Sequence, residues 1–215
     1  MRAGILVLGP LLAKYKNAKV SLPGGCAIGS RPVNFHLDAL KKMGANIKIK
    51  DGYIVASAKK GLKGTFIKFP KVSVGATENI LIASCFAEGK SKLRNCALEP
   101  EVKDLMNFLK KLGCQIHQIG NRGLNVTGIR ELKSISHRVI FDRIEAGTYI
   151  IASALTNGNL IIKNVDPKII STEIKLLSKM GINFIKKKNY LIVNSKKKLK
   201  SIRLITQPYP GFPTD

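Results

Sequence analysis

The sequence predicts an α/β fold built of repeated β-α-β-α-β-β units, because two features recur along the chain at nearly one spacing. The first feature is an apolar stretch that ends in glycine. Leu81–Gly89 matches Ile150–Gly158 after a shift of 69 positions, and Asn95 falls on Asn164 at the same shift. Self-similarity at a fixed period is typical of proteins assembled from one supersecondary unit.

The second recurring feature is a helical segment that is closed by glycine. Lys41–Gly44 lies 69 positions before Lys110–Gly113, and Ser178–Gly181 follows after a further 68. Glycine just after the last helical residue is the common left-handed C-cap. The chain therefore contains three copies of the unit, of which the first is incomplete.

Each unit carries an apolar, alanine-rich first helix, predicted over Thr77–Ala87 in the second copy and Ile144–Leu155 in the third. A helix that is apolar nearly all round is expected to be buried on every side. We therefore expect the helices to pack inward and the sheets outward. No glycine-rich phosphate loop follows a strand, so the pattern does not indicate a dinucleotide-binding sheet.

A short strand, a second helix and a tight pair of strands complete each unit. Helical spacing is clearest at Leu105, Phe108, Leu109 and Leu112. The strands after the first helix are predicted at Ser91–Asn95 and Leu160–Asn164. The second helices are predicted at Val33–Met43, Glu101–Leu112 and Ser171–Met180. The strand pairs are predicted at Asn46–Lys50 with Tyr53–Ala56, Gln115–Ile119 with Leu124–Thr127, and Ile182–Ile185 with Tyr190–Asn194.

The opening apolar segment, Met1–Leu8, is predicted to be a strand. It runs directly into Gly9 and Pro10 without a small-residue cleavage pattern, which argues against a signal peptide. No apolar run approaches the ~18 residues that a membrane-spanning helix needs. The expectation is a cytoplasmic protein with no membrane partner.

The net charge of +24 would ordinarily suggest a nucleic-acid partner. Of the 37 basic residues, however, 29 are lysines scattered along the chain and 8 are arginines. Base recognition favours arginine forks and stacking aromatic side chains, and the sequence has no such cluster. We interpret most of the charge as solvated surface. Nucleic-acid binding and a general attraction for anionic substrates are the alternatives.

The four cysteines show no CxxC spacing and no zinc-type pairing with histidine. Cys85 and Cys114 lie within apolar patterns, and Cys96 lies at a strand end, so all three are predicted to be buried. The set suits a reducing compartment without disulfides.

Cys26 differs, because it lies in Leu22–Val33, which holds three glycines and two prolines. Such a segment is neither a helix nor a regular strand, and its glycines permit motion or close approach to a ligand. Arg31 lies five positions away, and a nearby positive charge stabilises a thiolate. Cys26 is therefore a candidate nucleophile, with an incidental surface thiol as the alternative.

Two segments before helices are candidates for anion binding. Arg31 and Pro32 precede the second helix of the first copy, where an arginine fork and free backbone donors could hold an anion. Lys71–Thr77 occupies the gap before the next apolar helix, and its lysine, serine and glycine suit phosphate contact. A simple N-cap at Ser73 or Thr77 is the equally weighted alternative.

These segments resemble the UDP-N-acetylglucosamine 1-carboxyvinyltransferase family, whose active-site loop is similar to Ser21–Val33. The sister family that acts on shikimate 3-phosphate shares the fold but is not expected to carry this cysteine loop. The other segments that resemble the family, in the same order, are Met1–Ala3, Leu8–Leu11, Lys71–Thr77, Asp142–Glu145 and Phe212–Asp215.

The resemblance implies roles for individual residues. Cys26 would protonate phosphoenolpyruvate and form a covalent adduct with it, and fosfomycin would alkylate the same thiol. Arg31 would bind phosphate, Arg2 would shape the substrate site, and Asp215 would be the base at the sugar 3-hydroxyl. The other implied substrate-binding residues are Pro32, Val33, Asn34 and Phe35 along the uridine pocket, and Lys71, Val72, Ser73, Val74 and Gly75 along the nucleotide sugar and its diphosphate. The family often has aspartate at the position of Asn34, which retains an acceptor oxygen.

The implied reaction is transfer of enolpyruvyl from phosphoenolpyruvate to UDP-N-acetylglucosamine with release of phosphate, the first committed step of peptidoglycan precursor synthesis. Protonation of the methylene carbon makes its neighbour electrophilic, and a carboxylate helps to remove the hydroxyl proton. Closure of the Cys26 loop would exclude water. No metal or organic cofactor is expected, and the expected partners are the two small-molecule substrates rather than nucleic acid or membrane.

The resemblance also implies two inside-out α/β barrel domains with three units each, of which this chain is an incomplete two-domain fragment. Residues 1–140 would form part of the first domain with about two units, and residues 141–215 part of the second with one unit. The family's early Lys-Asn pair and a later arginine, which contact phosphoenolpyruvate, have no counterpart here. The chain alone is therefore expected to be unstable or inactive. An inactive remnant and a basic binding protein that reuses the scaffold are the alternatives.

Overall fold

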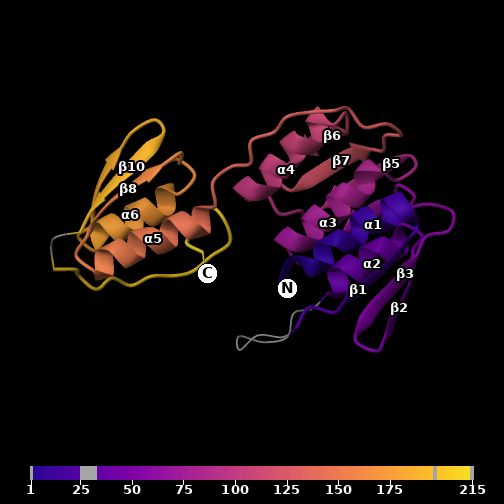
Figure 1. The fold of residues 1–215 in the computed structure, drawn as a ribbon, viewed down its shortest axis with the longest axis horizontal. Coiled ribbons are helices and arrows are strands. Elements are labelled where there is room, and N and C mark those ends of the chain that lie inside the picture. The colour runs from indigo at the N-terminus through magenta and orange to yellow at the C-terminus, as the bar shows by residue number, and fades with distance from the viewer. Residues whose placement is uncertain (1, 25–32, 196–197, 214–215) are drawn as a thin grey trace. The chain divides into compact units, whose positions relative to one another are not determined.

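The computed structural model describes residues 2–24, 33–195 and 198–213, and the chain divides into two compact units (Figure 1). Unit 1 is Met1–His137 and unit 2 is Arg138–Asp215. Each unit has a hydrophobic core of its own.

The opening segment is helical, so the prediction of a strand over Met1–Leu8 is wrong. A 3-10 helix, η1 (Arg2–Val7), continues directly into α1 (Leu8–Tyr15). Pro10 is the third residue of α1, in the first turn, where a missing backbone N–H costs no hydrogen bond within the helix. The Gly9-Pro10 pair therefore does not end the apolar segment but lies at the start of a helix.

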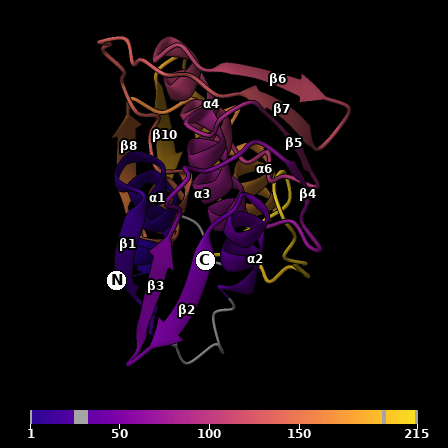
Figure 2. The same cartoon turned by 90° about the vertical axis from the view of Figure 1, so that its right-hand side faces the viewer.

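Unit 1 places its helices between two sheets (Figure 2). Besides α1, its helices are α2 (Asn34–Lys42), α3 (Val74–Cys85) and α4 (Pro100–Lys111). Its strands are β1 (Asn17–Ser21), β2 (Asn46–Lys50), β3 (Tyr53–Ser57), β4 (Phe66–Lys68), β5 (Lys90–Arg94), β6 (Gln115–Ile119) and β7 (Gly123–Thr127). The strand orders are β1-β3-β2 and β4-β5-β7-β6, and β4 with β5 is the parallel pair.

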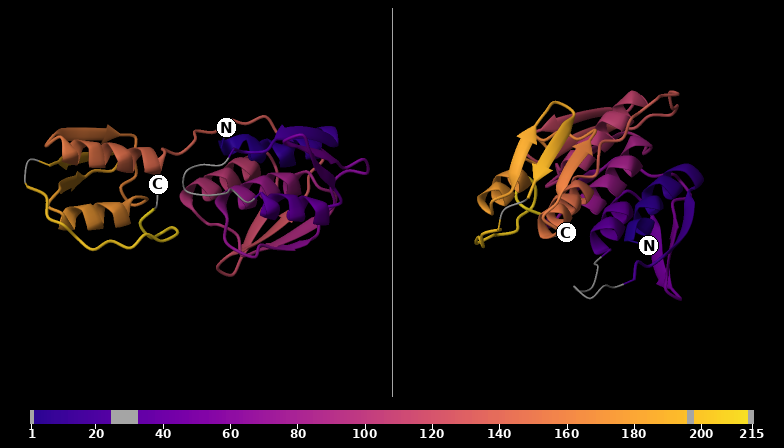
Figure 3. Two further views of the ribbon diagram at one scale, coloured as in Figure 1. Left: turned by 90° about the horizontal axis from the view of Figure 1, so that it is seen from below. Right: turned by 60° about the vertical axis from the view of Figure 1, so that its left-hand side comes forward.

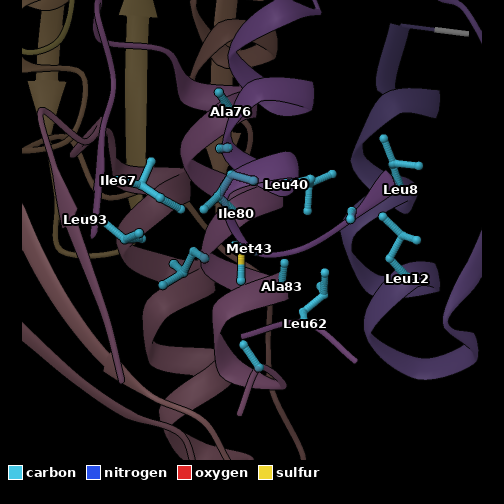
Figure 4. Packing of buried hydrophobic residues seen from close by; sticks show 14 of the residues in the cluster. Leu8, Leu12, Leu40, Met43, Leu62, Ile67, Ala76, Ile80, Ala83 and Leu93 are labelled. Carbon is cyan, nitrogen blue, oxygen red and sulfur yellow. The ribbon is translucent and has the colours of Figure 1, made fainter. Parts of the chain in front are cut away.

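The core of unit 1 forms around α3, which contacts η1, α1, α2, α4 and β7. Ile80, Leu81 and Ala83 of this helix are fully buried, and Ala76 and Cys85 lie at its two buried ends. Figure 4 shows side chains of α1, α2 and α3 meeting those of the strands and of the segment that contains Leu62. The prediction that the apolar first helix is buried on every side is confirmed for α3.

Unit 2 packs two helices beside one three-stranded sheet (Figure 3). Its helices are α5 (Arg143–Leu155) and α6 (Ser171–Lys179), and its strands are β8 (Asn159–Lys163), β9 (Asn183–Lys186) and β10 (Tyr190–Asn194). Here the first helix is less buried than predicted. Tyr149 and Leu155 of α5 are 57% and 73% exposed, because within unit 2 the helix packs on one side only.

The three copies share one topology, which confirms the predicted repeat. In each, the last strand lies between the other two, as β3, β7 and β10 do. The predicted closing glycines have positive φ, at 97° for Gly44, 112° for Gly113 and 106° for Gly181. The second copy begins with β4 and has the complete predicted order β-α-β-α-β-β, from β4 to β7.

None of the helices in the described parts of the chain combines the length and the hydropathy needed to cross a bilayer.

Candidate functional site

The structure describes nine of the thirteen residues that the sequence nominates. Cys26, Arg31, Pro32 and Asp215 lie outside the described residues, as does most of the predicted loop around Cys26. The nominated residues within the described part are Arg2, Val33, Asn34, Phe35, Lys71, Val72, Ser73, Val74 and Gly75. They occur on three segments, η1, the start of α2 and the start of α3.

The start of α3 is an ordinary N-cap that also leaves donors for an anion. Ser73 has extended backbone, and its Oγ accepts a hydrogen bond from the Ala76 N–H at 3.3 Å. The N–H groups of Val74 and Gly75 come before the first intrahelical bond, so α3 itself provides no acceptor for them. The N-cap interpretation of Ser73 is therefore confirmed, and the N–H groups of Val74 and Gly75 have no acceptor within α3.

The Thr77 side chain makes hydrogen bonds within the protein and is not exposed for contact with phosphate. Its side chain is fully buried, donates to the Ser73 carbonyl at 2.7 Å and accepts from the Ala97 N–H at 2.9 Å. It therefore fastens the segment between β5 and α4 to the first turn of α3.

The starts of α2 and α3 lie against each other and against η1. A side-chain carbon built on Gly75 would lie 3.5 Å from His36 Cε1 and 3.6 Å from Leu6 Cδ2. Val33 caps α2 and is buried, Phe35 is half-buried, and Asn34 is exposed. The structure thus brings together the three described segments that carry the nominated residues.

The sequence did not nominate Asn79, which is fully buried. It lies one turn after Gly75, near the junction at which η1 and the starts of α2 and α3 meet. Its Oδ1 accepts from the Gly9 N–H at 2.8 Å, and its Nδ2 lies 3.0 Å from both the Ile5 carbonyl oxygen and His36 Nδ1. An amide side chain inside an otherwise apolar helix was the signal for this residue, because a buried amide needs partners.

Burial controls the protonation of His36. The ring is desolvated, which lowers the pKa of His36 from 6.5 to about 4. The imidazole is therefore neutral near pH 7 and adds no positive charge beside α3.

Three carboxylates lie close enough to interact, that of Glu78 on α3 and those of Glu99 and Glu101 at the start of α4. Burial, together with the carboxylates of Glu101 and Glu99, raises the pKa of Glu78 to about 7. Glu99 is buried, and among the described residues its Oε2 has no hydrogen-bond partner. Glu78 is therefore partly protonated near pH 7.

In unit 2, the segment that leads toward the nominated Asp215 is held at the starts of two helices. The Arg143 guanidinium lies over the Tyr209 ring, 5.4 Å from its centroid. The Thr172 hydroxyl donates to the Pro210 carbonyl at 2.6 Å. The backbone before the nominated base is thus attached to both α5 and α6.

The three described cysteines are buried, as predicted. Burial raises the pKa of Cys96 to about 12. A hydrogen bond with the Cys114 thiol, together with burial, raises the pKa of Cys85. Neither Cys85 nor Cys96 is therefore a thiolate near pH 7.

Within residues 2–24, 33–195 and 198–213, no group of three or more histidine, cysteine or acidic side chains is arranged to hold a metal ion.

Comparison with known proteins gives strong matches over the whole chain. A relative from Pelagibacter ubique, named UDP-N-acetylglucosamine 1-carboxyvinyltransferase, is 60% identical over 215 residues, which are all of this chain and 52% of that protein. Relatives of the same name from Endomicrobium trichonymphae and Rickettsia akari are 48% and 51% identical over all of this chain and 51% of theirs. The chain thus spans about half the length of these relatives.

Solved structures agree on the fold. The enolpyruvyl transferase NikO from Streptomyces tendae matches 98% of this chain and 51% of its own, with a TM-score of 0.79 at 21% identity. An EPSP synthase from Acinetobacter baumannii matches 96% of this chain and 48% of its own, with a TM-score of 0.66 at 19% identity. The predicted α/β fold of the enolpyruvyl transferases, represented here by part of its length, is confirmed.

Residues 1–215 match the family described as EPSP synthase (3-phosphoshikimate 1-carboxyvinyltransferase), and the chain belongs to that family.

Proposed function

We propose that this chain is part of an enzyme that transfers the enolpyruvyl group of phosphoenolpyruvate to the 3-hydroxyl of UDP-N-acetylglucosamine and releases phosphate. The observation that carries the proposal is the 60% identity, over all 215 residues, to a relative named for this activity. The product would enter peptidoglycan precursor synthesis, and the enzyme would act in the cytoplasm.

The described geometry supports a binding site for the diphosphate of the nucleotide sugar. The Ser73 hydroxyl and the N–H groups of Val74 and Gly75 would bind the anion at the start of α3, where Ser73 is the N-cap. Asn34 and Phe35 directly precede His36, which lies beside Gly75, and a uracil ring would meet their amide and aromatic side chains. Arg2 and Lys71 would contribute positive charge from the flanking segments.

The chemistry itself would depend on residues outside the described part. Cys26 would donate the proton to the methylene carbon and form the covalent adduct, Arg31 would hold the phosphate, and Asp215 would accept the proton of the sugar hydroxyl. Pro32 and Val33 would continue the uridine pocket toward Asn34. Tyr209 and Pro210, which precede Asp215 by a few positions in the sequence, are attached to α5 and α6, respectively.

Fosfomycin labelling tests the assignment of Cys26. The native chain is treated with fosfomycin and digested, and the adduct is located by mass spectrometry. Adduct is expected on the Cys26 peptide and absent from the peptides of Cys85, Cys96 and Cys114, which are buried and serve as internal controls. Equal labelling of all four peptides, or labelling that spares Cys26, would contradict the proposal.

A ligand titration tests the substrate. UDP-N-acetylglucosamine is added to ¹⁵N-labelled chain, and shikimate 3-phosphate is added to a second sample. The sugar nucleotide is expected to shift the amide signals of Asn34, Phe35 and Ser73–Gly75, and shikimate 3-phosphate is not. Shifts caused by shikimate 3-phosphate alone would favour the acceptor for which the family is described.

A further inference from the structure

Asn79 connects three segments that are distant in sequence. It is fully buried and bonds to Gly9 and Ile5, which lie 70 and 74 positions away, and to His36, which lies 43 positions away. The backbone of α3 carries this amide, so its contacts join α3 directly to α1, η1 and α2.

The orientation of the amide follows from its two backbone partners. The Gly9 N–H can only donate and therefore faces Oδ1, whereas the Ile5 carbonyl can only accept and therefore faces Nδ2. The second hydrogen of Nδ2 then points at His36 Nδ1, which must accept it. His36 is thereby fixed as the neutral tautomer with its proton on Nε2, the atom that lies on the side of Gly75.

The three connected segments are the ones that carry the nominated substrate residues. Arg2 lies on η1, Asn34 and Phe35 precede His36 on α2, and Ser73–Gly75 begin the helix on which Asn79 lies one turn later. Loss of the amide would leave a buried N–H, a buried carbonyl and a buried imidazole nitrogen without this partner. The first two groups belong to the continuous segment η1–α1 and the third to α2, so both segments would lose a hydrogen-bonded connection to α3.

We propose that Asn79 is a positioning residue for the sugar-nucleotide site, which holds η1, α2 and α3 in the one arrangement that lets their side chains and N–H groups reach the same ligand. This inference rests on the function proposed above. A residue that only satisfied hydrogen bonds in the core would affect folding, whereas a positioning residue also sets the state of His36 and the affinity for the ligand.

The state of His36 provides the first test, in the unaltered chain and in Asn79→Asp. Ring ¹⁵N shifts of the unaltered chain are expected to show the Nε2–H tautomer, and a proton on Nδ1 would overturn the proposal. In Asn79→Asp the carboxylate still accepts from Gly9 but can only accept from the ring, so His36 Nδ1 gains a proton. The pKa of His36 is expected to rise by at least two units, and an unchanged titration would overturn the proposal.

Amide hydrogen exchange provides the second test, with Asn79→Ala compared against Ser84→Ala. Ser84 is a matched control because it lies on the same helix, is fully buried, and has no hydrogen-bond partner for its Oγ among the described residues. Asn79→Ala is expected to speed exchange at Gly9, Leu37 and Thr77 at least tenfold, with Val126 on β7, which makes no hydrogen bond with Asn79, unchanged. Equal acceleration at all of these amides would show loss of overall stability alone and would overturn the proposal.

Affinity separates this inference from the proposed function. The Kd for UDP-N-acetylglucosamine is expected to rise at least tenfold in Asn79→Ala and to stay within twofold in Ser84→Ala. Equal affinity in Asn79→Ala and the unaltered chain would overturn the positioning role and leave the proposed function intact.

If the unaltered chain binds no sugar nucleotide and fosfomycin spares Cys26, the proposed function fails. The exchange and tautomer results then decide whether Asn79 couples the segments. Where Asn79→Ala does not fold, Asn79→Asp replaces it, and because the carboxylate keeps the bond to Gly9, faster exchange is then expected at Leu37 and Thr77 but not at Gly9.

Discussion

Gly9 shows how close α1 and α3 lie at the residue scale. A side-chain carbon built on Gly9 would lie 2.7 Å from the Asn79 carbonyl oxygen and closer still to Asn79 Oδ1. Both atoms belong to a packed helix, so they have little room to move. Only a residue without a Cβ fits at this crossing.

Gly9→Ala is therefore expected to destabilise unit 1 by about 1–3 kcal/mol, because overpacking forces backbone shifts. The measurement is urea unfolding of the whole chain, followed by NMR signals of unit 1. Gly4→Ala is the matched control, since a carbon built on Gly4 meets nothing within 4 Å. Equal unfolding midpoints for the two variants would contradict this account of the crossing.

The histidine at the junction makes stability depend on pH. The pKa of His36 is lowered by burial from 6.5 to about 4, so between these values the unfolded chain binds a proton that the folded chain does not. The free energy of unfolding should therefore rise with pH across this window and fall as pH drops toward 4. His36→Gln, which has no titrating ring, should flatten this part of the profile.

Glu78 acts in the opposite direction and must be removed to isolate the effect of His36. Burial and the neighbouring carboxylates raise the pKa of Glu78 from 4.5 to about 7, so its contribution to stability falls as pH rises through that range. Unfolding is best measured in Glu78→Gln and in the double variant with His36→Gln. A slope between pH 4 and 6.5 that persists unchanged in the double variant would refute the assignment to His36.

At the scale of single elements, most second helices and strands could be predicted from the sequence. Their apolar spacing and their closing glycines are local signals, and α2, α4 and α6 begin and end within about two residues of the predicted bounds. The helix α1 and the strand β1 were missed for a physical reason. The turn between them is made by Lys16 at φ 61°. This left-handed conformation is uncommon for lysine, so the sequence does not indicate a turn there.

Only the part of the candidate site that has a local sequence signal could be predicted. Glycine, serine and lysine before a helix mark an anion-binding end by local chemistry, so Ser73–Gly75 could be nominated from the sequence. The contacts of Asn79 join residues 43 to 74 positions apart, and no local pattern encodes such pairings. The roles of Cys26, Arg31 and Asp215 stay predictions.

The Thr172 hydroxyl attaches the segment around Pro210 to α6. Thr172→Val removes the donor to the Pro210 carbonyl without changing side-chain shape, and is expected to speed amide exchange at Gln207 and Gly211 several-fold. Thr148→Val is the matched control, because the Thr148 hydroxyl bonds only to Ile144 within α5. The idea that α6 fixes this segment fails if both variants leave Gln207 and Gly211 unchanged.

At the scale of the whole molecule, the two first helices α3 and α5 have similar apolar sequences and different surroundings. In unit 1 α3 is enclosed, whereas in unit 2 Tyr149, Ile151 and Leu155 of α5 are 57%, 40% and 73% exposed. Neighbouring apolar side chains of this size favour association with other apolar surfaces.

The chain is therefore expected to self-associate at micromolar concentration, and Leu155→Lys should weaken that association without unfolding unit 2. Sedimentation velocity measures the association, and circular dichroism checks the fold. Lys175→Leu, on α6, makes the reverse substitution on another helix and should not reduce association. A monomeric unaltered chain would show that the exposed face of α5 does not drive contact between copies.

The crossing at Gly9 also constrains how the protein can evolve. The main chain of α3 and the Asn79 amide both lie against Gly9, and a side-chain carbon at position 9 would meet the Asn79 carbonyl oxygen at 2.7 Å. Every residue at position 79 keeps that backbone oxygen, so replacement of the amide alone would not admit alanine or serine at position 9. Gly9 should thus be retained among descendants of this sequence, including those that replace Asn79.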